Sequence, residues 1–190
     1  MMRRCMALAA IMLAAGIASA QGFAAQDVDG RAVSLVIPGQ TRAVVLFFIA
    51  SDCPYSNRSV PEMKRVEAEF KARGVAFWFV YPNATQTVES IHEHLAAFGV
   101  GDVALVDPHE RLARLTGAKW TPEAAVLMVE KGRLRPVYVG RIDDRYLGIG
   151  KERPQATQHD LGDAVGAVVA GRTPKKPGGP SVGCGIVGAP

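Results

Sequence analysis

The sequence is poor in cysteine: three occur in 190 residues, at positions 5, 53 and 184. No two of them form a Cys-x-x-Cys pair, so the usual signatures of a structural zinc site and of covalent haem attachment are absent. Two of these thiols can meet only if the fold brings distant parts of the chain together.

A strong charge imbalance is also absent. Lys and Arg number 22 against 18 Asp and Glu, and the first twenty residues hold two arginines and no acidic residue, so the remainder has 20 against 18. No Lys/Arg stripe with interleaved aromatic residues is present. These features exclude an electrostatic nucleic-acid-binding surface.

The longest apolar run, Ala7 to Ala20, is shorter than the roughly 20 residues that a membrane-spanning helix needs. It follows two arginines and ends in Ala18-Ser19-Ala20, which is typical of a secretory signal cleaved before Gln21. An uncleaved membrane anchor is the alternative. Cleavage predicts a periplasmic or secreted protein, not inserted in the membrane, with Cys53 and Cys184 in a compartment where disulfides persist.

One stretch holds the strongest local patterns. Residues 43–50 are uncharged and rich in β-branched and aromatic side chains, which predicts a buried central strand. Pro54 suits the first turn of a helix whose apolar positions recur until Gly74. Cys53 is therefore expected at a helix N-terminus, which favours its thiolate, whereas the neighbouring Asp52 opposes a second negative charge.

The remaining elements follow from periodicity and turn residues. In the first half we expect a β-hairpin over 22–36 at a sheet edge, a strand over 75–80 parallel to the strand at 43–50, and a helix from 85 or 87 to 98. In the second half we expect a strand over 103–106, a helix from 108 to 117, a hairpin of 123–130 and 135–141, and a helix from about 157 to 171. From Arg172 on, four prolines and five glycines in nineteen residues predict neither helix nor strand. Cys184 is thus expected on a flexible arm.

These residues carry a family resemblance. Cys53-Pro-Tyr-Ser56 at a strand-to-helix junction, Pro61 and Trp120-Thr121-Pro122 resemble the thioredoxin-like fold. From Phe23 to Gly171 the chain is most similar to the redoxins, the peroxiredoxin-related and thiol-specific antioxidant superfamily. Gly140 to Tyr146 and the Gly-Cys-Gly-Ile tail resemble a secreted subgroup of redoxins.

The resemblance implies an α/β, thioredoxin-like three-layer sandwich with a mixed central sheet and an N-terminal β-hairpin. It also implies that Pro122 is cis and lies against Cys53. The expected organisation is a signal peptide over 1–20, a redoxin domain over 21–171 and a flexible tail over 172–190.

One departure from the family pattern concerns Ser56, which replaces the second cysteine of the family's Cys-x-x-Cys. A hydroxyl is far too weak an acid to release a mixed disulfide. Cys184 is the candidate for that role, because it is the only other cysteine after the signal. A permanent Cys53–Cys184 staple and an unpaired Cys184 remain alternatives.

The first functional hypothesis is an exported thiol–disulfide oxidoreductase without a cofactor or metal. Its catalytic residues would be Cys53, Cys184 and Pro122, and its partners would be protein thiols or disulfides, or small thiols.

Two alternatives stay open. A peroxidase pattern, Pro-x-x-x-Thr-x-x-Cys, would need Pro at 46 and Thr at 50, where Leu46 and Ala50 stand, although Ser51 could substitute. A non-catalytic binding or copper-delivery module similar to Sco-type proteins would need a second sulfur where Asn57 stands.

Other polar residues give weaker indications. His92 and His94, two apart on a predicted helix, are a poor metal pair and are expected in solvent. The charged residues Arg141, Asp143, Asp144 and Arg145 indicate a solvated loop of paired charges or, alternatively, the rim of a site.

Overall fold

The computed structural model describes residues 24–37, 39–101 and 104–186. The predicted signal peptide and its cleavage site lie outside the described residues. Among the described residues, no helix combines the length and the apolar character that crossing a membrane requires.

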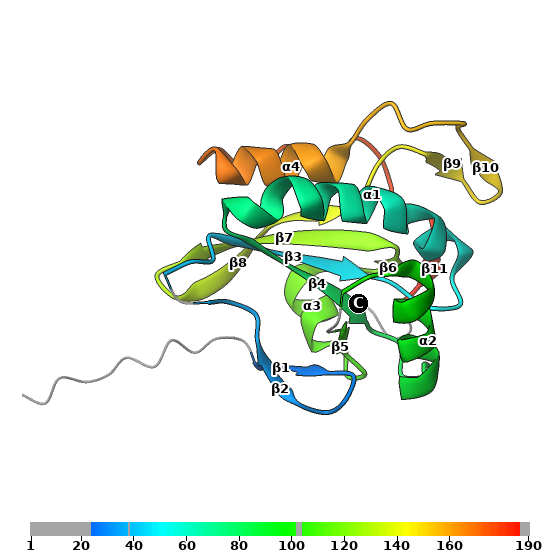
Figure 1. The fold of residues 1–190 in the computed structure, drawn as a ribbon. Helices are drawn as coiled ribbons and strands as arrows, with labels where there is room; N and C mark the ends of the chain where they lie inside the picture. The colour runs from blue at the N-terminus through cyan, green and yellow to red at the C-terminus, as the bar shows by residue number, and fades with distance from the viewer. Residues whose placement is uncertain (1–23, 38, 102–103, 187–190) are drawn as a thin grey trace, which may run out of the picture.

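The centre of the fold is β3 (Ala43–Phe48), in which every side chain is buried, as the apolar run predicts. It lies within a seven-stranded sheet in the order β2-β1-β5-β4-β3-β7-β8 (Figure 1). The other strands are β1 (Ala24–Asp27), β2 (Ala32–Ser34), β4 (Val75–Tyr81), β5 (Ala104–Val106), β7 (Glu123–Glu130) and β8 (Arg133–Gly140).

The sheet is mixed. Strand β3 runs parallel to β4 and antiparallel to β7, and β4 runs parallel to β5. The hairpin of β1 and β2 extends the sheet at its β5 edge, as predicted. Lys131 and Gly132, which connect β7 to β8, both have positive φ angles, 50° and 75°, the backbone of a tight two-residue hairpin turn.

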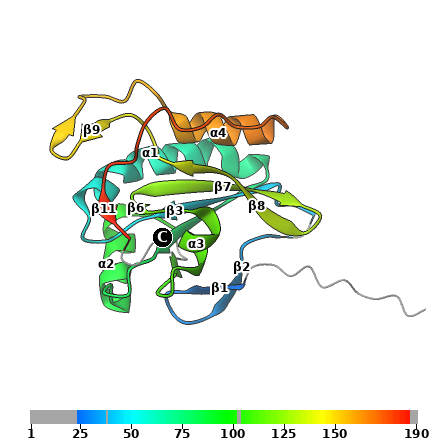
Figure 2. The same cartoon turned by 180° about the vertical axis from the view of Figure 1, so that it is seen from behind.

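Two cores flank the sheet because successive side chains of β3 point to opposite faces. Val45 and Phe47 pack with the apolar faces of α1 (Pro54–Phe70) and α4 (Asp160–Val169). Val44 and Leu46 pack with α3 (Arg111–Thr116) on the other face. Figures 1 and 2 show α1 and α4 together on one side of the sheet and α3 on the other, the predicted three-layer sandwich.

Helix α1 continues into a 3-10 turn, η1 (Lys71–Arg73), and ends at Gly74, as predicted. Helix α2 (Val88–Phe98) begins after Thr87, whose side chain accepts from the Ser90 N–H in a capping box. The predicted start of α3 at Pro108 is wrong. Glu110 adopts a left-handed conformation with φ 53°, so the helix begins at Arg111.

Four short strands were not predicted: β6 (Trp120–Thr121), β9 (Tyr146–Gly148), β10 (Lys151–Glu152) and β11 (Cys184–Gly185). They form two separate two-stranded ribbons, β9 with β10 and β6 with β11. The prediction that no strand follows Arg172 is therefore wrong, because β11 pairs with a part of the chain more than sixty residues away.

Candidate active site at the Cys53–Cys184 disulfide

Cys53 lies where the sequence predicts it, between β3 and α1. It is the N-cap residue of α1, with extended backbone angles, and Pro54 occupies the first helical turn. Its side chain is 1% exposed, and its Sγ atom lies 3.1 Å from the Thr121 carbonyl oxygen. Cys53 therefore lies at the positive end of the α1 dipole, a position that favours a thiolate when the cysteine is reduced.

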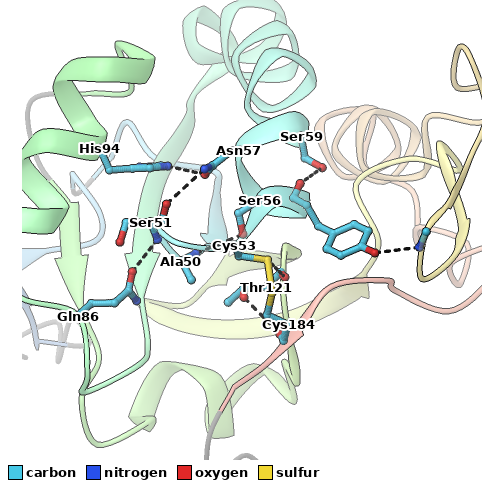
Figure 3. Close-up of a disulfide and its surroundings, with 12 residues drawn as sticks. Ala50, Ser51, Cys53, Ser56, Asn57, Ser59, Gln86, His94, Thr121 and Cys184 are labelled. Atoms are coloured by element: carbon cyan, nitrogen blue, oxygen red, sulfur yellow. Dashed lines mark hydrogen bonds between the residues drawn. A yellow bond between two sulfur atoms is a disulfide. The ribbon is translucent and has the colours of Figure 1, made fainter.

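Cys53 and Cys184 form a disulfide across 131 positions of sequence (Figure 3). Strand β11 pairs antiparallel with β6 so that Cys184 faces Thr121. Cys184 is half-buried, whereas Cys53 is buried. The structure therefore contradicts the alternative that Cys184 is unpaired.

Thr121 contacts both cysteines. Its carbonyl oxygen lies against the Cys53 sulfur, and its hydroxyl donates to the Cys184 carbonyl at 3.2 Å. The bond from Thr121 to Pro122 is cis, as predicted. The proline was predicted from the sequence and the threonine was not, although the position of Thr121 directly before Pro122 indicated it.

Ser56, which replaces the second motif cysteine, is fully buried. Its hydroxyl accepts from the Ala50 N–H at 3.3 Å, so Ser56 stabilises the end of the loop that precedes Cys53. Leu46 and Ala50, at the positions of the peroxidase pattern, are buried apolar residues. Neither offers a hydroxyl to a peroxide.

His94 is buried at 5% exposure, so its expected solvent position is wrong. Its Nδ1 atom lies 2.8 Å from the Tyr81 hydroxyl and its Nε2 atom 2.8 Å from Asn57 Oδ1, and Asn57 donates in turn to the Ser51 carbonyl. Burial raises the pKa of Tyr81, so the phenol keeps its proton and can donate to Nδ1. The neutral ring with its hydrogen on Nε2 therefore satisfies both partners and links α2 to the loop that carries Cys53 (Figure 3).

Glu123, directly after Pro122, is a second residue of the site that was not predicted from the sequence. It is buried, and its Oε2 atom accepts from the backbone N–H groups of Lys119 at 2.7 Å and Trp120 at 3.1 Å. Its Oε1 atom accepts from the Ser181 hydroxyl at 2.6 Å. One carboxylate thus holds both the β6 segment and the C-terminal segment.

The charged cluster after β8 is not a solvated loop. Asp144 is buried, and burial by itself would raise the pKa of its carboxyl group. Hydrogen bonds from the Thr157 hydroxyl and from the backbone N–H groups of Thr157 and Gln158 outweigh this effect and lower the pKa of Asp144 to about 2. Arg141 pairs with Asp160 at 2.8 Å, and both side chains are largely buried. These charges fix the segment that leads into the β9–β10 ribbon.

The β9–β10 ribbon contacts the cysteine motif. The Tyr55 hydroxyl accepts from the Gly150 N–H at 3.0 Å, and its ring packs edge-on against Tyr146. Arg58 and Glu152 form an ion pair at 2.9 Å. The motif tyrosine therefore supports the surroundings of the disulfide rather than the sulfur itself.

The comparisons with known proteins agree with this geometry. A model of the AhpC/TSA family matches residues 18–143. The chain belongs to the AhpC/TSA family. This membership confirms the predicted redoxin relationship, and a search of curated proteins found no match.

Two solved structures resemble this AhpC/TSA-family chain over most of its length. A hypothetical protein from Sinorhizobium meliloti 1021 has a TM-score of 0.71 and 28% identity, with 88% of this chain and 91% of that chain covered. An uncharacterized conserved protein from Geobacillus kaustophilus has a TM-score of 0.70 and 24% identity, with 88% of each chain covered. The α/β thioredoxin-like fold is thereby confirmed.

A more distant likeness links the fold to a protein of known class. A secreted Mycobacterium tuberculosis disulfide oxidoreductase, homologous to E. coli DsbE, has a TM-score of 0.50 and 17% identity, with 80% of this chain and 97% of that chain covered. At this identity the likeness concerns the fold.

Proposed function

We propose that this AhpC/TSA-family protein is an exported thiol–disulfide oxidoreductase in which Cys53 is the attacking sulfur and Cys184 the resolving sulfur. The observation that carries the proposal is the disulfide between Cys184 and a cysteine at the N-cap of a 17-residue helix. Pro122, in the cis bond beside the pair, shapes the wall of the site.

The cycle begins with the dithiol form. The Cys53 thiolate attacks one sulfur of a substrate disulfide and releases the other substrate sulfur as a thiolate. The Cys184 thiolate then attacks Cys53 Sγ, forms the intramolecular disulfide and releases the second substrate thiolate. The substrate has gained two electrons and the protein has lost two.

External thiols complete the cycle. One donor thiolate attacks the Cys53–Cys184 disulfide and forms a mixed disulfide, and a second donor thiolate displaces the protein sulfur from it. The products are a donor disulfide and the protein dithiol. Protein thiols or small thiols can serve as donors, and no cofactor enters the cycle.

Export and the domain limits are part of the proposal. The signal pattern over residues 1–20, the disulfide and the likeness to a secreted oxidoreductase support it. The mature chain would comprise a redoxin domain over 21–171 and a C-terminal segment over 172–190. Intact-mass analysis of exported protein should give a chain that begins at Gln21, and retention of residues 1–20 would contradict export with cleavage.

The activity test compares two variants in an assay of disulfide reduction. Cys53→Ser should abolish turnover because Cys184 alone can form no intramolecular disulfide that releases the substrate, whereas Cys184→Ser should accumulate mixed disulfides on Cys53, detectable by mass spectrometry. Full turnover by Cys53→Ser would remove the active-site assignment and favour the non-catalytic module.

Peroxidase activity is a second candidate because the chain belongs to the AhpC/TSA family. Ser51 is adjacent to the position of the missing threonine and could supply the hydroxyl. Its backbone N–H donates to the Gln86 side chain, and its carbonyl oxygen accepts from the Asn57 amide. Peroxide consumption that depends on both Cys53 and Ser51 would favour this function. Ser51→Ala should leave disulfide reduction unchanged.

A further inference from the structure

The segment that carries Cys184 contacts the domain before it reaches the disulfide. The ring of Pro177 packs against Gly140 so closely that a Cβ atom at Gly140 would collide with it. The Gly178 N–H donates to Asp160 at 2.6 Å, and the Ser181 hydroxyl donates to the buried carboxylate of Glu123. Two acidic side chains thus hold the segment upstream of Cys184.

A further anchor lies downstream of Cys184. The Ile186 N–H donates to the Lys119 carbonyl at 2.9 Å. The Ile186 side chain is 5% exposed and packs in the core that contains Leu112 and Leu127. Cys184 is therefore fixed from both sides by contacts that involve neither sulfur.

We propose that residues 177–186 stay docked on the domain after the disulfide is reduced and keep the Cys184 thiol beside Cys53. This inference rests on the proposed function and deepens it: the segment is a resident part of the active site, held in place by Asp160, Glu123 and the burial of Ile186. A freely moving arm would supply Cys184 at an effective concentration in the millimolar range. A docked segment raises this concentration because less freedom is lost when the disulfide forms.

Gly183 offers a variant that obstructs docking of the segment. A Cβ atom there would collide with the Thr121 carbonyl oxygen and lie 3.0 Å from Pro122 Cδ, both rigid groups. A Cβ atom at Gly185 would meet only the Trp120 ring, at an ordinary 4.0 Å. Gly183→Ala and Gly185→Ala thus make the same change on either side of Cys184, and only the first obstructs docking.

The first experiment measures the effective concentration of the pair. Each protein is equilibrated with mixtures of reduced and oxidised glutathione, quenched with acid, and its disulfide fraction read by mass. Wild type and Gly185→Ala should both give an effective concentration at least tenfold above the millimolar value of a free arm, equivalent to about 30 mV, and Gly183→Ala should give a lower value than either. A wild-type value in the millimolar range would overturn the proposal.

The second experiment removes the disulfide altogether. In Cys184→Ser the Ile186 amide should remain protected from hydrogen exchange, and adding Gly183→Ala should remove that protection. Rapid exchange in Cys184→Ser alone would mean that the disulfide holds the segment, and the proposal would be wrong. Neither readout depends on turnover, so a protein that passes both but reduces no substrate would refute the proposed function only.

Discussion

His94 illustrates how a single side chain can stabilise the loop that carries the reactive sulfur. Desolvation by burial lowers the pKa of His94, so the ring is neutral in the folded protein. Its contacts are the Tyr81 hydroxyl, the Asn57 amide and the ring of Phe98. Of these, only Tyr81 titrates, and its raised pKa keeps it neutral as well.

This environment predicts a pH-dependent stability. In the unfolded chain histidine titrates near about 6.5, above the lowered value in the fold, so the unfolded state binds the proton first as the pH falls. Unfolding should therefore become easier below about pH 6.5. Urea unfolding of His94→Gln should show a smaller loss of stability than wild type between pH 7.5 and 5.5.

His92→Gln is the matched control, because it removes a histidine two residues earlier on the same helix whose exposed side chain pairs with Asp29 at the surface. The difference between the His94→Gln and His92→Gln profiles isolates the effect of the buried ring. Identical pH profiles for His94→Gln and wild type would contradict this role for His94.

Residue-scale roles were only partly predictable from the sequence. Cys53 stands out because a buried strand, a cysteine and a proline at a helix start leave local patterns. His94 and Glu123 leave none, since their partners Asn57 and Ser181 are distant in the sequence. Whether a side chain is buried depends on which other elements of the fold pack over it, and the local sequence does not determine this.

Among the elements, α3 depends most clearly on one side chain. Asp107 precedes the helix by several residues, and its Oδ2 atom accepts from the N–H groups of Leu112 at 2.9 Å and Ala113 at 3.0 Å. Two of the unpaired donors at the start of this six-residue helix are thereby satisfied inside the protein.

Removal of this cap has a definite expected cost. Asp107→Ala should lower the free energy of unfolding by about 1–2 kcal/mol, because it leaves two buried N–H groups without an acceptor. Asp107→Asn keeps an acceptor oxygen and should retain most of the stability. Urea unfolding of the two variants measures the difference, and equal losses would show that the cap itself contributes little.

The long elements were predictable because each has a complete pattern of its own. Strand β3 was predicted from an apolar run, within two residues of its observed ends, and helix α1 was predicted from Pro54 to Gly74, where its last turn is the 3-10 turn η1. The two-residue strands β6 and β11 were not, because each forms only where the other is present. The prolines and glycines of the tail exclude local structure but allow close backbone approach, as at Gly183.

For the whole molecule, the disulfide is a long-range cross-link. Closing a loop of 131 residues stabilises the folded state by about 5 kcal/mol in the chain-entropy treatment. The seven-stranded sheet and its two cores do not depend on it, so we expect the reduced protein to stay folded at 25 °C.

Denaturant unfolding with and without dithiothreitol measures this contribution. The midpoint should fall in the reduced wild type and should not respond to dithiothreitol in a Cys53→Ser, Cys184→Ser double variant. Complete unfolding of the reduced protein in the absence of denaturant would show that the cores are insufficient alone.

The distance between the two cysteines along the chain also determines when the redox centre can be assembled. During synthesis, Cys53 emerges long before Cys184, and residues 54–183 contain no cysteine with which it could pair wrongly. Closure must wait until the C-terminal segment has crossed the finished domain to reach β6. Formation of this disulfide therefore reports that folding of the domain is complete, and a chain interrupted before residue 184 leaves the Cys53 thiol without this partner.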